Sequence, residues 1–292
     1  MNILTFDIEE WFLDQQIPGY HNATFVKYDR CLSSVLDLLD EKGFKATFFC
    51  LGKVAELFPD IVKTISDRGH EIGCHSNTHT WLTQLTPEQL KADTHEAIAR
   101  LEDVTGAKVV SYRAPAFSIG KSNKWAFEIL AENGIERDAS IYPATRDFGG
   151  FSDFGHKKPC IVECRGMCIK EFPMPTTKLL TKETAYSGGG YFRLLPYTFI
   201  EKTMKESPYN ICYFHIGDLV PEKEKWMDRA TYEACYKESG TLVARLSRHF
   251  KSNVGRRKAF NKMARLFDHF KFIDLRQADT MTIWESAERV RL

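Results

Sequence analysis

Residues 46–74 decide the fold class, and they run ATFFCLGKVAELFPDIVKTISDRGHEIGC. Residues 46–51 form an apolar run that is typical of a buried strand. A helix is expected from about Lys53 to Gly69, because apolar residues recur there at helical spacing as far as a glycine that can end a helix. A second short strand follows at 71–74. Strand, helix and strand in this order predict a βαβ unit, whose two strands are parallel.

The same alternation extends on both sides of this unit. The expected elements are a strand at 2–6, a helix from Asp29 to Gly43, a helix from Thr86 to Gly106 opened by a capping box, a strand at 109–112 and a helix from Ser122 to Gly134. Repeated βαβ units form a parallel sheet, which either stays open or closes into a barrel.

Composition excludes several classes of protein. The chain has 292 residues, of which 43% are hydrophobic and 27% charged, and this is typical of a globular protein rather than a disordered or fibrous one. The net charge of +1 provides no general field that would attract nucleic acid or a membrane. No apolar stretch approaches the length of a membrane-spanning helix, and residues 1–7 lack the features of a secretory signal. The eight cysteines form no CxxC pair, so we expect reduced, buried thiols in a cytoplasmic protein.

The second half of the chain is less regular. Residues 142–190 are rich in glycine, proline and turn residues, with short strands expected at 161–164 and 169–172. We interpret this part as loops and hairpins over one face of the barrel. The expected organisation is therefore one domain over 1–292, with a barrel over about 1–220 and a C-terminal extension over about 221–292.

One charge bias stands out near the C-terminus. Residues 241–271 contain nine Lys and Arg residues and a single acid, Asp268, interleaved with apolar side chains. The simplest interpretation is a solvated face of terminal helices. The functional alternative is a basic ledge for an anionic substrate or for a membrane surface.

Acidic residues follow the first predicted strand. Asp7 and Glu9 come directly after residues 2–6, and Glu10 is next to them. Acids in this place can simply cap the next helix. However, functional groups in parallel α/β folds gather at the carboxyl ends of strands, which makes the position informative.

Two histidines follow the third predicted strand. His75 and His79 are four residues apart, so they share one face if the segment makes a helical turn. Two neutral imidazoles and one carboxylate are a common ligand set for a divalent metal. The pattern HxxxH alone is frequent by chance, and its place directly after a strand strengthens it.

Three more ionisable groups end predicted strands. Arg113 is costly to bury without a carboxylate, and either Asp7 or Asp138 would serve. Asp138 follows the next short strand, and His215 ends an apolar strand at 211–214. A single histidine after a strand is more often structural than catalytic. Taken together, five ionisable sets at strand ends predict one site.

In order and spacing, these residues resemble the motifs of a known family. The polysaccharide deacetylases, carbohydrate esterase family 4 with the chitooligosaccharide-deacetylase homology domain, have five motifs that are similar to residues 5–9, 75–79, 113–115, the Asp138 segment and 213–215. Residues 187–196 and the stretch at Arg256 and Arg257 are similar to a subgroup associated with exopolysaccharide gene clusters. The resemblance implies an α/β fold, a deformed (β/α)7-type barrel, as a single domain with irregular loops and C-terminal helices.

The resemblance also implies an activity and roles for these residues. The expected function is metal-dependent hydrolysis of N-acetyl groups on a glycan, with release of acetate. Glu9, His75 and His79 would hold a divalent metal, with Zn2+ as the first candidate and Co2+ or Ni2+ as others. Asp7 would be the base, held by Arg113, and His215 would be the acid, kept protonated by Asp138.

The chain departs from the family pattern at two places. The usual first motif has two adjacent aspartates, whereas here Ile8 follows Asp7, so the ligand role passes to Glu9, with Glu10 as a less favoured substitute. The usual fourth motif has a tryptophan after its aspartate, whereas Tyr142 stands here, so the acetyl pocket must be built differently. The glycine run 188–190 lacks the ending of a P-loop, and we expect a tight turn that brings backbone close to the substrate.

Two other functions remain open. The first is a metal-free or metal-dependent amidohydrolase acting on a small C–N bond outside sugars. The second is a non-catalytic carbohydrate-binding barrel. For the deacetylase, the expected partner is an N-acetylated glycan that is lipid-linked or nucleotide-linked, met in the cytoplasm at the inner membrane face through 241–271. A nucleic-acid partner is not expected, and the oligomeric state is left open.

Overall fold

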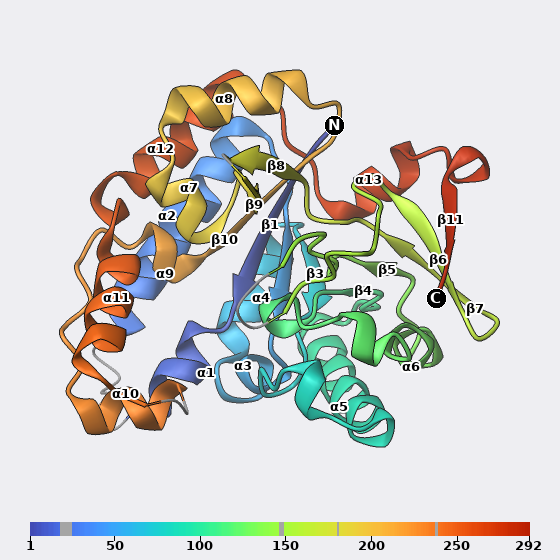
Figure 1. Cartoon of the computed structure of the whole chain (residues 1–292), viewed down its shortest axis with the longest axis horizontal. Helices are drawn as coiled ribbons and strands as arrows, with labels where there is room; N and C mark the ends of the chain where they lie inside the picture. Colours follow the sequence, from blue (N-terminus) through green and yellow to red (C-terminus); the bar gives the residue numbers. More distant parts are fainter. Residues whose placement is uncertain (18–24, 146–148, 180, 237–238) are drawn as a thin grey trace.

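The parallel strands expected from the sequence form one continuous sheet (Figure 1). The computed structural model describes residues 1–17, 25–145, 149–179, 181–236 and 239–292. Within these ranges the strands are β1 Asn2–Ile8, β2 Thr47–Cys50, β3 Glu71–Cys74, β4 Ser111–Tyr112, β5 Arg137–Asp138, β6 Cys160–Cys164, β7 Met167–Glu171, β10 Asn210–His215 and β11 Glu288–Arg291, with a separate hairpin of β8 Thr176–Leu179 and β9 Lys182–Ala185. The order across the sheet is β10-β1-β2-β3-β4-β5-β7-β6-β11.

Strands β10, β1, β2, β3, β4, β5 and β7 run parallel to their neighbours and form the wall of a deformed (β/α)7 barrel. No strand pairing among the described residues joins β7 back to β10, which is the deformation. The seam is spanned by single contacts instead, such as the hydroxyl of Tyr209, which donates to the carbonyl of Pro173 at 2.9 Å. The α/β single-domain barrel expected from the sequence is thus confirmed.

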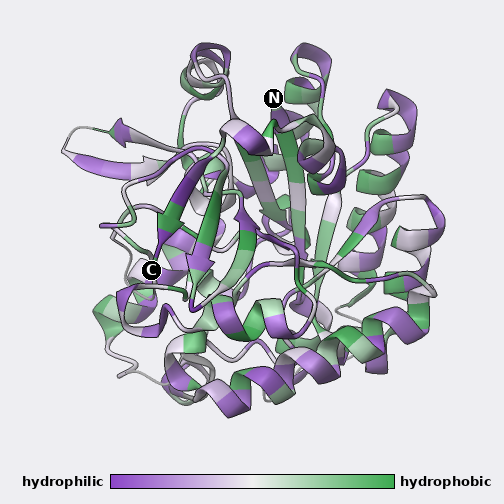
Figure 2. Ribbon diagram, turned by 90° about the vertical axis from the view of Figure 1, so that its right-hand side faces the viewer, coloured by the Kyte–Doolittle hydropathy of each residue, from purple (hydrophilic) through white to green (hydrophobic). Residues whose placement is uncertain are grey.

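The helices surround the sheet and carry its connections. Those described are α1 Glu10–Gln15, α2 Phe25–Lys42, α3 Gly52–Leu57, α4 Pro59–Asp67, α5 Pro87–Thr105, α6 Ala126–Glu132, α7 Gly189–Leu194, α8 Tyr197–Glu206, α9 Ile216–Leu219, α10 Arg229–Tyr236, α11 Leu242–Asn253, α12 Arg256–His269 and α13 Leu275–Met281. Figure 2 shows hydrophobic stretches on the central strands and alternating hydrophobic and hydrophilic residues along the surrounding helices, the pattern of amphipathic helices. None of the helices in the described ranges combines the length and apolar character needed to cross a bilayer.

Strand β1 shows how the sheet separates core from site. Because successive side chains of a strand point to opposite faces, Leu4, Phe6 and Ile8 face the helices and are fully buried there. The rings of Phe6 and Phe48 stack 4.8 Å apart in this outer core, and burying each such side chain contributes about 1.5–3 kcal/mol. The alternate residues, Thr5 and Asp7, face the barrel interior. This alternation places a carboxylate inside the barrel.

Several local expectations need correction. The expected helix over 53–69 is broken into α3 and α4, because Phe58 adopts a non-helical conformation (φ −136°, ψ 53°) before Pro59. Helix α2 begins at Phe25, and Asp29 lies inside it and accepts a hydrogen bond from the indole of Trp11 at 2.8 Å. The capping box at Thr86 is present as expected.

The irregular second half also differs in part. The β6–β7 hairpin extends the main sheet, where β11 from the C-terminus pairs with β6, whereas we expected it to cover a barrel face. Seven cysteines with described side chains are free, and six of them are buried as expected, while Cys168 is exposed. The side chain of Cys235 lies outside the described residues.

Candidate metal and catalytic site

One glutamate and two histidines converge at the carboxyl ends of β1 and β3. The Oε2 atom of Glu9 lies 3.3 Å from Nε2 of His75 and 2.9 Å from Nε2 of His79. One ligand atom from each of the three residues lies within 4.8 Å of the other two. The predicted metal ligands therefore meet at one point.

The details of this cluster fit a divalent metal. The Nδ1 atom of His75 lies 2.8 Å from the carbonyl of Arg113, which can only accept, so Nδ1 carries the proton and the lone pair of Nε2 faces Glu9. The buried Oε2 atom of Glu9 has no hydrogen bond of normal geometry among the described residues, although two imidazole nitrogens lie close to it. Two imidazole nitrogens and a carboxylate oxygen that converge in this way are arranged to share an ion.

The loop that carries the two histidines does not make the helical turn that would put an i, i+4 pair on one face. Ser76 (φ 67°) and His79 (φ 63°) both adopt left-handed backbone conformations, which are costly for residues other than glycine. The surrounding structure holds the loop: the backbone N–H of Asn77 donates to Asp93 of α5 at 2.9 Å, and the N–H of Gly52 donates to the carbonyl of Ser76 at 3.0 Å. The i, i+4 spacing thus brings the imidazoles together through a braced, irregular loop.

Asp7 and Arg113 form a buried ion pair inside the barrel. Nη1 of Arg113 donates to Oδ1 of Asp7 at 2.9 Å and to the hydroxyl of Thr5 at 2.8 Å, and its Nε donates to the carbonyl of Ala139 at 3.2 Å. Arg113 is fully buried, and its guanidinium lies 4.4 Å from the centre of the Phe49 ring. Of the two partners considered for Arg113, the structure provides Asp7.

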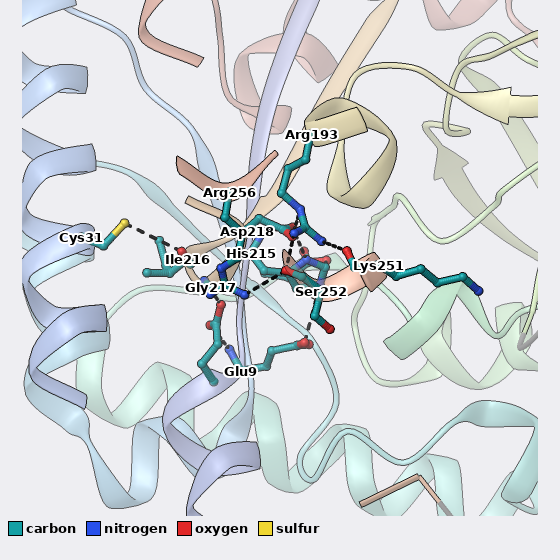
Figure 3. Close-up of polar contacts among 12 residues, drawn as sticks. Glu9, Cys31, Arg193, His215, Ile216, Gly217, Asp218, Lys251, Ser252 and Arg256 are labelled. Carbon is teal, nitrogen blue, oxygen red and sulfur yellow. Dashed lines mark hydrogen bonds and ion pairs between the residues drawn. The ribbon is translucent and has the colours of Figure 1, made fainter. Parts of the chain in front are cut away.

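His215, at the carboxyl end of β10, lies next to the predicted metal ligand Glu9. Its Nε2 atom lies 3.5 Å from Oε1 of Glu9 and 3.9 Å from Oδ2 of Asp7. Its Nδ1 atom lies 3.0 Å from Oδ2 of Asp218, and Oδ1 of Asp218 lies 3.1 Å from Nε of Arg193 (Figure 3). The imidazole is thus fixed by a carboxylate that is itself held by an arginine.

The charges at this position control the protonation of His215. Burial alone would lower its pKa, but Glu9, Asp218 and Asp7 outweigh burial and raise the pKa well above its usual value. For Glu9, burial works in the raising direction, and the neighbouring His79 and His215 hold the pKa well below the usual value. The arrangement favours an ionised Glu9 opposite a protonated imidazole.

The structure does not bring Asp138 together with His215. Asp138 lies at the end of β5 on the outer side of the barrel wall, where both of its oxygens bind Ser140, with Oδ1 accepting from the hydroxyl at 2.6 Å. Burial raises the pKa of Asp138 and, together with the charge of Asp138, that of its neighbour Glu171. The role expected for Asp138, to hold His215, falls geometrically to Asp218. The sequence contains a signal that points to it, an acid three residues after the end of a strand, where it can cap a short helix.

Glu10 is not part of the cluster that Glu9 forms with His75 and His79. Its Oε1 atom accepts a hydrogen bond from the backbone N–H of Gly217, and burial raises its pKa to about 8, with the adjacent charge of Glu9 acting in the same direction. An acid that is neutral near pH 7 is a poor metal ligand. Between the two glutamates considered from the sequence, the geometry places Glu9 in the ligand position.

Aromatic rings line the barrel next to the ion pair. The ring of Phe117 lies 5.7 Å from that of Tyr142 and 5.2 Å from that of Tyr213, which in turn lies 6.1 Å from His215. The hydroxyl of Tyr142 accepts a hydrogen bond from the N–H of Ala185 at 2.8 Å. Tyr142 is therefore part of an apolar wall, and its hydroxyl holds the end of β9.

The glycine run serves a different contact from the one we expected. A Cβ atom on Gly188 would lie 2.1 Å from the ring of Tyr213, and one on Gly189 (φ +54°) would lie 2.6 Å from its hydroxyl. The glycines thus allow backbone to approach Tyr213 rather than a substrate.

Comparisons with known proteins agree with this arrangement. A family model described as polysaccharide deacetylase matches residues 3–137, and a second, described as a domain of unknown function (DUF3473), matches residues 139–280. A peptidoglycan deacetylase-like protein of Gibberella zeae is 34% identical over 109 residues, which are 37% of this chain and 31% of the relative. A peptidoglycan-N-acetylglucosamine deacetylase of Bacillus cereus is 36% identical over 95 residues, 32% of this chain and 34% of the relative. The chain thus matches about a third of the length of these relatives.

Solved structures share the fold at low identity. A crystal structure from Mycobacterium smegmatis has a TM-score of 0.63 at 16% identity and covers 100% of this chain and 92% of its own. A 4-alpha-glucanotransferase of Thermococcus litoralis has a TM-score of 0.59 at 14% identity, covering 100% of this chain and 41% of its own. Because the same barrel occurs in a protein with that name, the fold alone does not define the reaction.

The motifs, their convergence and the family model together support the polysaccharide deacetylases, carbohydrate esterase family 4, as the family of the matched segment, residues 3–137.

Proposed function

We propose that this protein is a metal-dependent hydrolase that removes N-acetyl groups from a polysaccharide or glycan intermediate and releases acetate. The observation that carries the proposal is the convergence of Glu9, His75 and His79 at one point, with Asp7 and His215 beside it. Hydrolysis of an acetamide needs an activated water, a stabilised oxyanion and a proton for the departing nitrogen, and these groups can meet those needs.

Glu9, His75 and His79 would hold the metal, with Zn2+ as the first candidate and Co2+ or Ni2+ as others. When bound, such an ion lowers the pKa of a bound water and polarises a carbonyl. Glu9 contributes a charge that is ionised at neutral pH, and His75 is held in the correct tautomer by the carbonyl of Arg113.

Asp7 is in place to take a proton from the attacking water. Its Oδ1 is occupied by Arg113 at 2.9 Å, and its Oδ2 faces His215 at 3.9 Å, so one carboxylate oxygen is left toward the site. The ion pair with Arg113 fixes the orientation of Asp7. A positioned base of this kind is worth about 10²–10⁴-fold in rate.

His215 is in place to donate a proton to the nitrogen as the C–N bond breaks. It must be protonated before the reaction, and Asp218 and Glu9 favour that form. The products are acetate and a free amine on the sugar. The proton taken by Asp7 and the proton given by His215 balance over the cycle.

The proposal includes where the substrate is met. We place the reaction in the cytoplasm at the inner membrane face, on a lipid-linked or nucleotide-linked glycan of exopolysaccharide biosynthesis. The free, buried cysteines support a reducing compartment.

An acetate-release screen tests the function. The purified protein is supplied with N-acetylated glycans and Zn2+, Co2+, Ni2+ or a chelator, and we expect acetate release that the chelator abolishes. Asp7→Asn should keep the metal but lose activity by at least about 10²-fold, whereas His75→Ala should lose bound metal as well, measured by elemental analysis. An Asp7→Asn protein with full activity would remove Asp7 as the base.

The same screen separates the two alternatives. Activity on small cyclic amides without acetate release from glycans would support an amidohydrolase. Saccharide binding without product under every metal would support a non-catalytic barrel. The intact set of His75, His79, Arg113 and His215 is the observation against the latter.

A further inference from the structure

Helix α11 exposes its apolar side chains to solvent instead of burying them against the protein. None of its residues, all of which lie in the described part of the chain, is buried. Its large apolar side chains point outward, with exposed fractions of 60% for Leu242, 76% for Val243, 52% for Leu246 and 65% for Phe250. Their spacing puts these four residues on one face of the helix. A surface helix of a globular protein normally turns such a face inward.

Polar side chains hold α11 to the protein instead. Arg245 donates to the carbonyls of Gly240 at 3.1 Å and Met227 at 3.3 Å. Asn253 accepts from the N–H of Glu224 at 2.8 Å, and the ring of His249 lies 5.5 Å from that of Trp226. These contacts hold α11 against the protein while its four large apolar side chains stay exposed.

The C-terminal end of α11 is tied to the catalytic side of the molecule. Arg193 donates to the carbonyls of Ser252 at 2.6 Å and Lys251 at 3.1 Å, and the same guanidinium pairs with Asp218, the partner of His215 (Figure 3). The side chain of Arg193 thus connects the C-terminal end of α11 with the Asp218–His215 pair.

Charge complementarity indicates what covers this face. Helix α11 carries Arg245, Arg248 and Lys251 and no acid, and Arg248 and Lys251 are exposed. An exposed apolar face with cationic side chains on the same helix is the composition of helices that lie in the interface of an anionic bilayer.

The structure also shows that some cations of the basic segment 241–271 are engaged within the protein. Arg256 of α12 is buried and bonds to the carbonyl of Val220 at 3.1 Å and to Glu224, and Lys262 binds the carbonyls of Phe192 and Leu195 at 2.8 and 2.7 Å. These cations connect parts of the protein. Arg256 and Lys262 are therefore engaged inside the protein, and within 241–271 the exposed apolar face suited to a membrane is on α11.

We propose that α11 docks this protein on a bilayer that carries anionic lipid headgroups, with Leu242, Val243, Leu246 and Phe250 inserted at the boundary between headgroups and acyl chains. Arg248 and Lys251 contact the lipid phosphates. The biological role of this docking rests on the proposed function, since the enzyme would encounter a lipid-linked glycan at a membrane. Vesicle binding and acetate release are measured separately, so the failure of one is distinguishable from the failure of the other.

Co-sedimentation of the full chain with vesicles tests the proposal. We expect binding to vesicles of phosphatidylcholine mixed with phosphatidylglycerol, and much weaker binding to phosphatidylcholine alone. The double variant Leu246→Ser/Phe250→Ser should reduce the partition coefficient at least about tenfold. Arg248→Gln/Lys251→Gln should weaken binding and reduce its dependence on salt. Acetate release from a soluble N-acetylated oligosaccharide, measured without vesicles, should be unchanged in both variants.

A matched control uses exposed apolar residues elsewhere. Val26 and Leu57 are 61% and 46% exposed on α2 and α3, and Val26→Ser/Leu57→Ser should bind vesicles as the unchanged protein does. Absence of binding to the anionic vesicles, equal binding to both vesicle types, or binding unaffected by the Leu246/Phe250 variant would each overturn the proposal. Self-association of the protein that disappears in that variant would also overturn it, because the face would then be an interface between copies.

Discussion

At the scale of single residues, the partner of His215 shows what sequence reasoning missed. The motif order suggested Asp138, which the structure places with Ser140 and Glu171 on the outer side of the barrel wall. Asp218 lies only three residues after His215, and its carboxylate reaches both the backbone N–H and the Nδ1 of that histidine. A motif match cannot show which face of a two-residue strand such as β5 a side chain occupies.

Replacing Asp218 should shift the pH profile of the reaction. The raised pKa keeps His215 protonated at neutral pH, so activity is present below that pKa and is lost as the pH rises through it. Asp218→Asn removes a raising contribution, so the basic limb of kcat/KM should move to lower pH by about one unit. Kinetics between neutral and alkaline pH measure this shift. Asp138→Asn is the comparison, and a shift in that variant alone would return the role to Asp138.

The choice between Glu9 and Glu10 is also decided by single side chains. The sequence did not decide which of the two glutamates is the metal ligand, because the directions of adjacent side chains after a strand depend on where the next helix begins. Glu9→Gln should reduce bound metal at least about tenfold, whereas Glu10→Gln should retain it, since Glu10 has a raised pKa of about 8 and faces Gly217. Elemental analysis after dialysis measures both. Loss of metal in Glu10→Gln with retention in Glu9→Gln would reverse the assignment.

At the scale of elements, the sequence correctly predicted the helix ends that depend on neighbouring residues. The capping box at Thr86 and the glycine that ends α5, Gly106 (φ 65°), are present as expected, because caps depend on neighbouring residues. The left-handed conformations of Ser76 and His79 were not predicted, because α5 and the start of α3 hold this loop from elsewhere in the chain. The spacing of the two histidines was informative even though the conformation between them was not.

Helix α7 provides a test of the close contact beneath the site. A Cβ on Gly188 would lie 2.1 Å from the Tyr213 ring and 2.5 Å from its carbonyl oxygen, so Gly188→Ala must displace β10 just before His215. We expect a loss of about 1–3 kcal/mol in the free energy of unfolding and reduced activity. Gly190→Ala is the control, since its nearest neighbour would be the flexible end of Arg193 at 3.8 Å. Calorimetry and acetate release check both variants, and equal stability would show that Tyr213 adapts freely.

At the scale of the whole molecule, the alternation of strands and helices predicted the barrel, but not how its ends meet. Strand β10, near residue 210, pairs with β1 in parallel from Asn2–Asn210 to Asp7–His215. No periodicity links segments that are 208 residues apart. Arg137 shows the same limit: it bonds to Glu71 at 3.0 Å and to Asp279 of α13 at 3.1 Å, which joins the two segments matched by separate family models.

These long-range pairings predict that the two matched segments unfold together. Strand β1 lies between β2 of its own segment and β10 of the other, and the N–H of Leu4 donates to the carbonyl of Ile273 at 2.9 Å. Separating the segments would expose both edges of β1 and remove His215 from the site. Native-state hydrogen exchange followed by mass spectrometry should therefore show the same opening free energy, within about 1 kcal/mol, for peptides of β1 and β10. If the β10 peptides exchanged through a lower-energy opening while β1 stayed protected, the C-terminal segment would be an independent unit docked on a smaller barrel. The proposed catalytic pair of Asp7 and His215 would then depend on that docking rather than on one shared core.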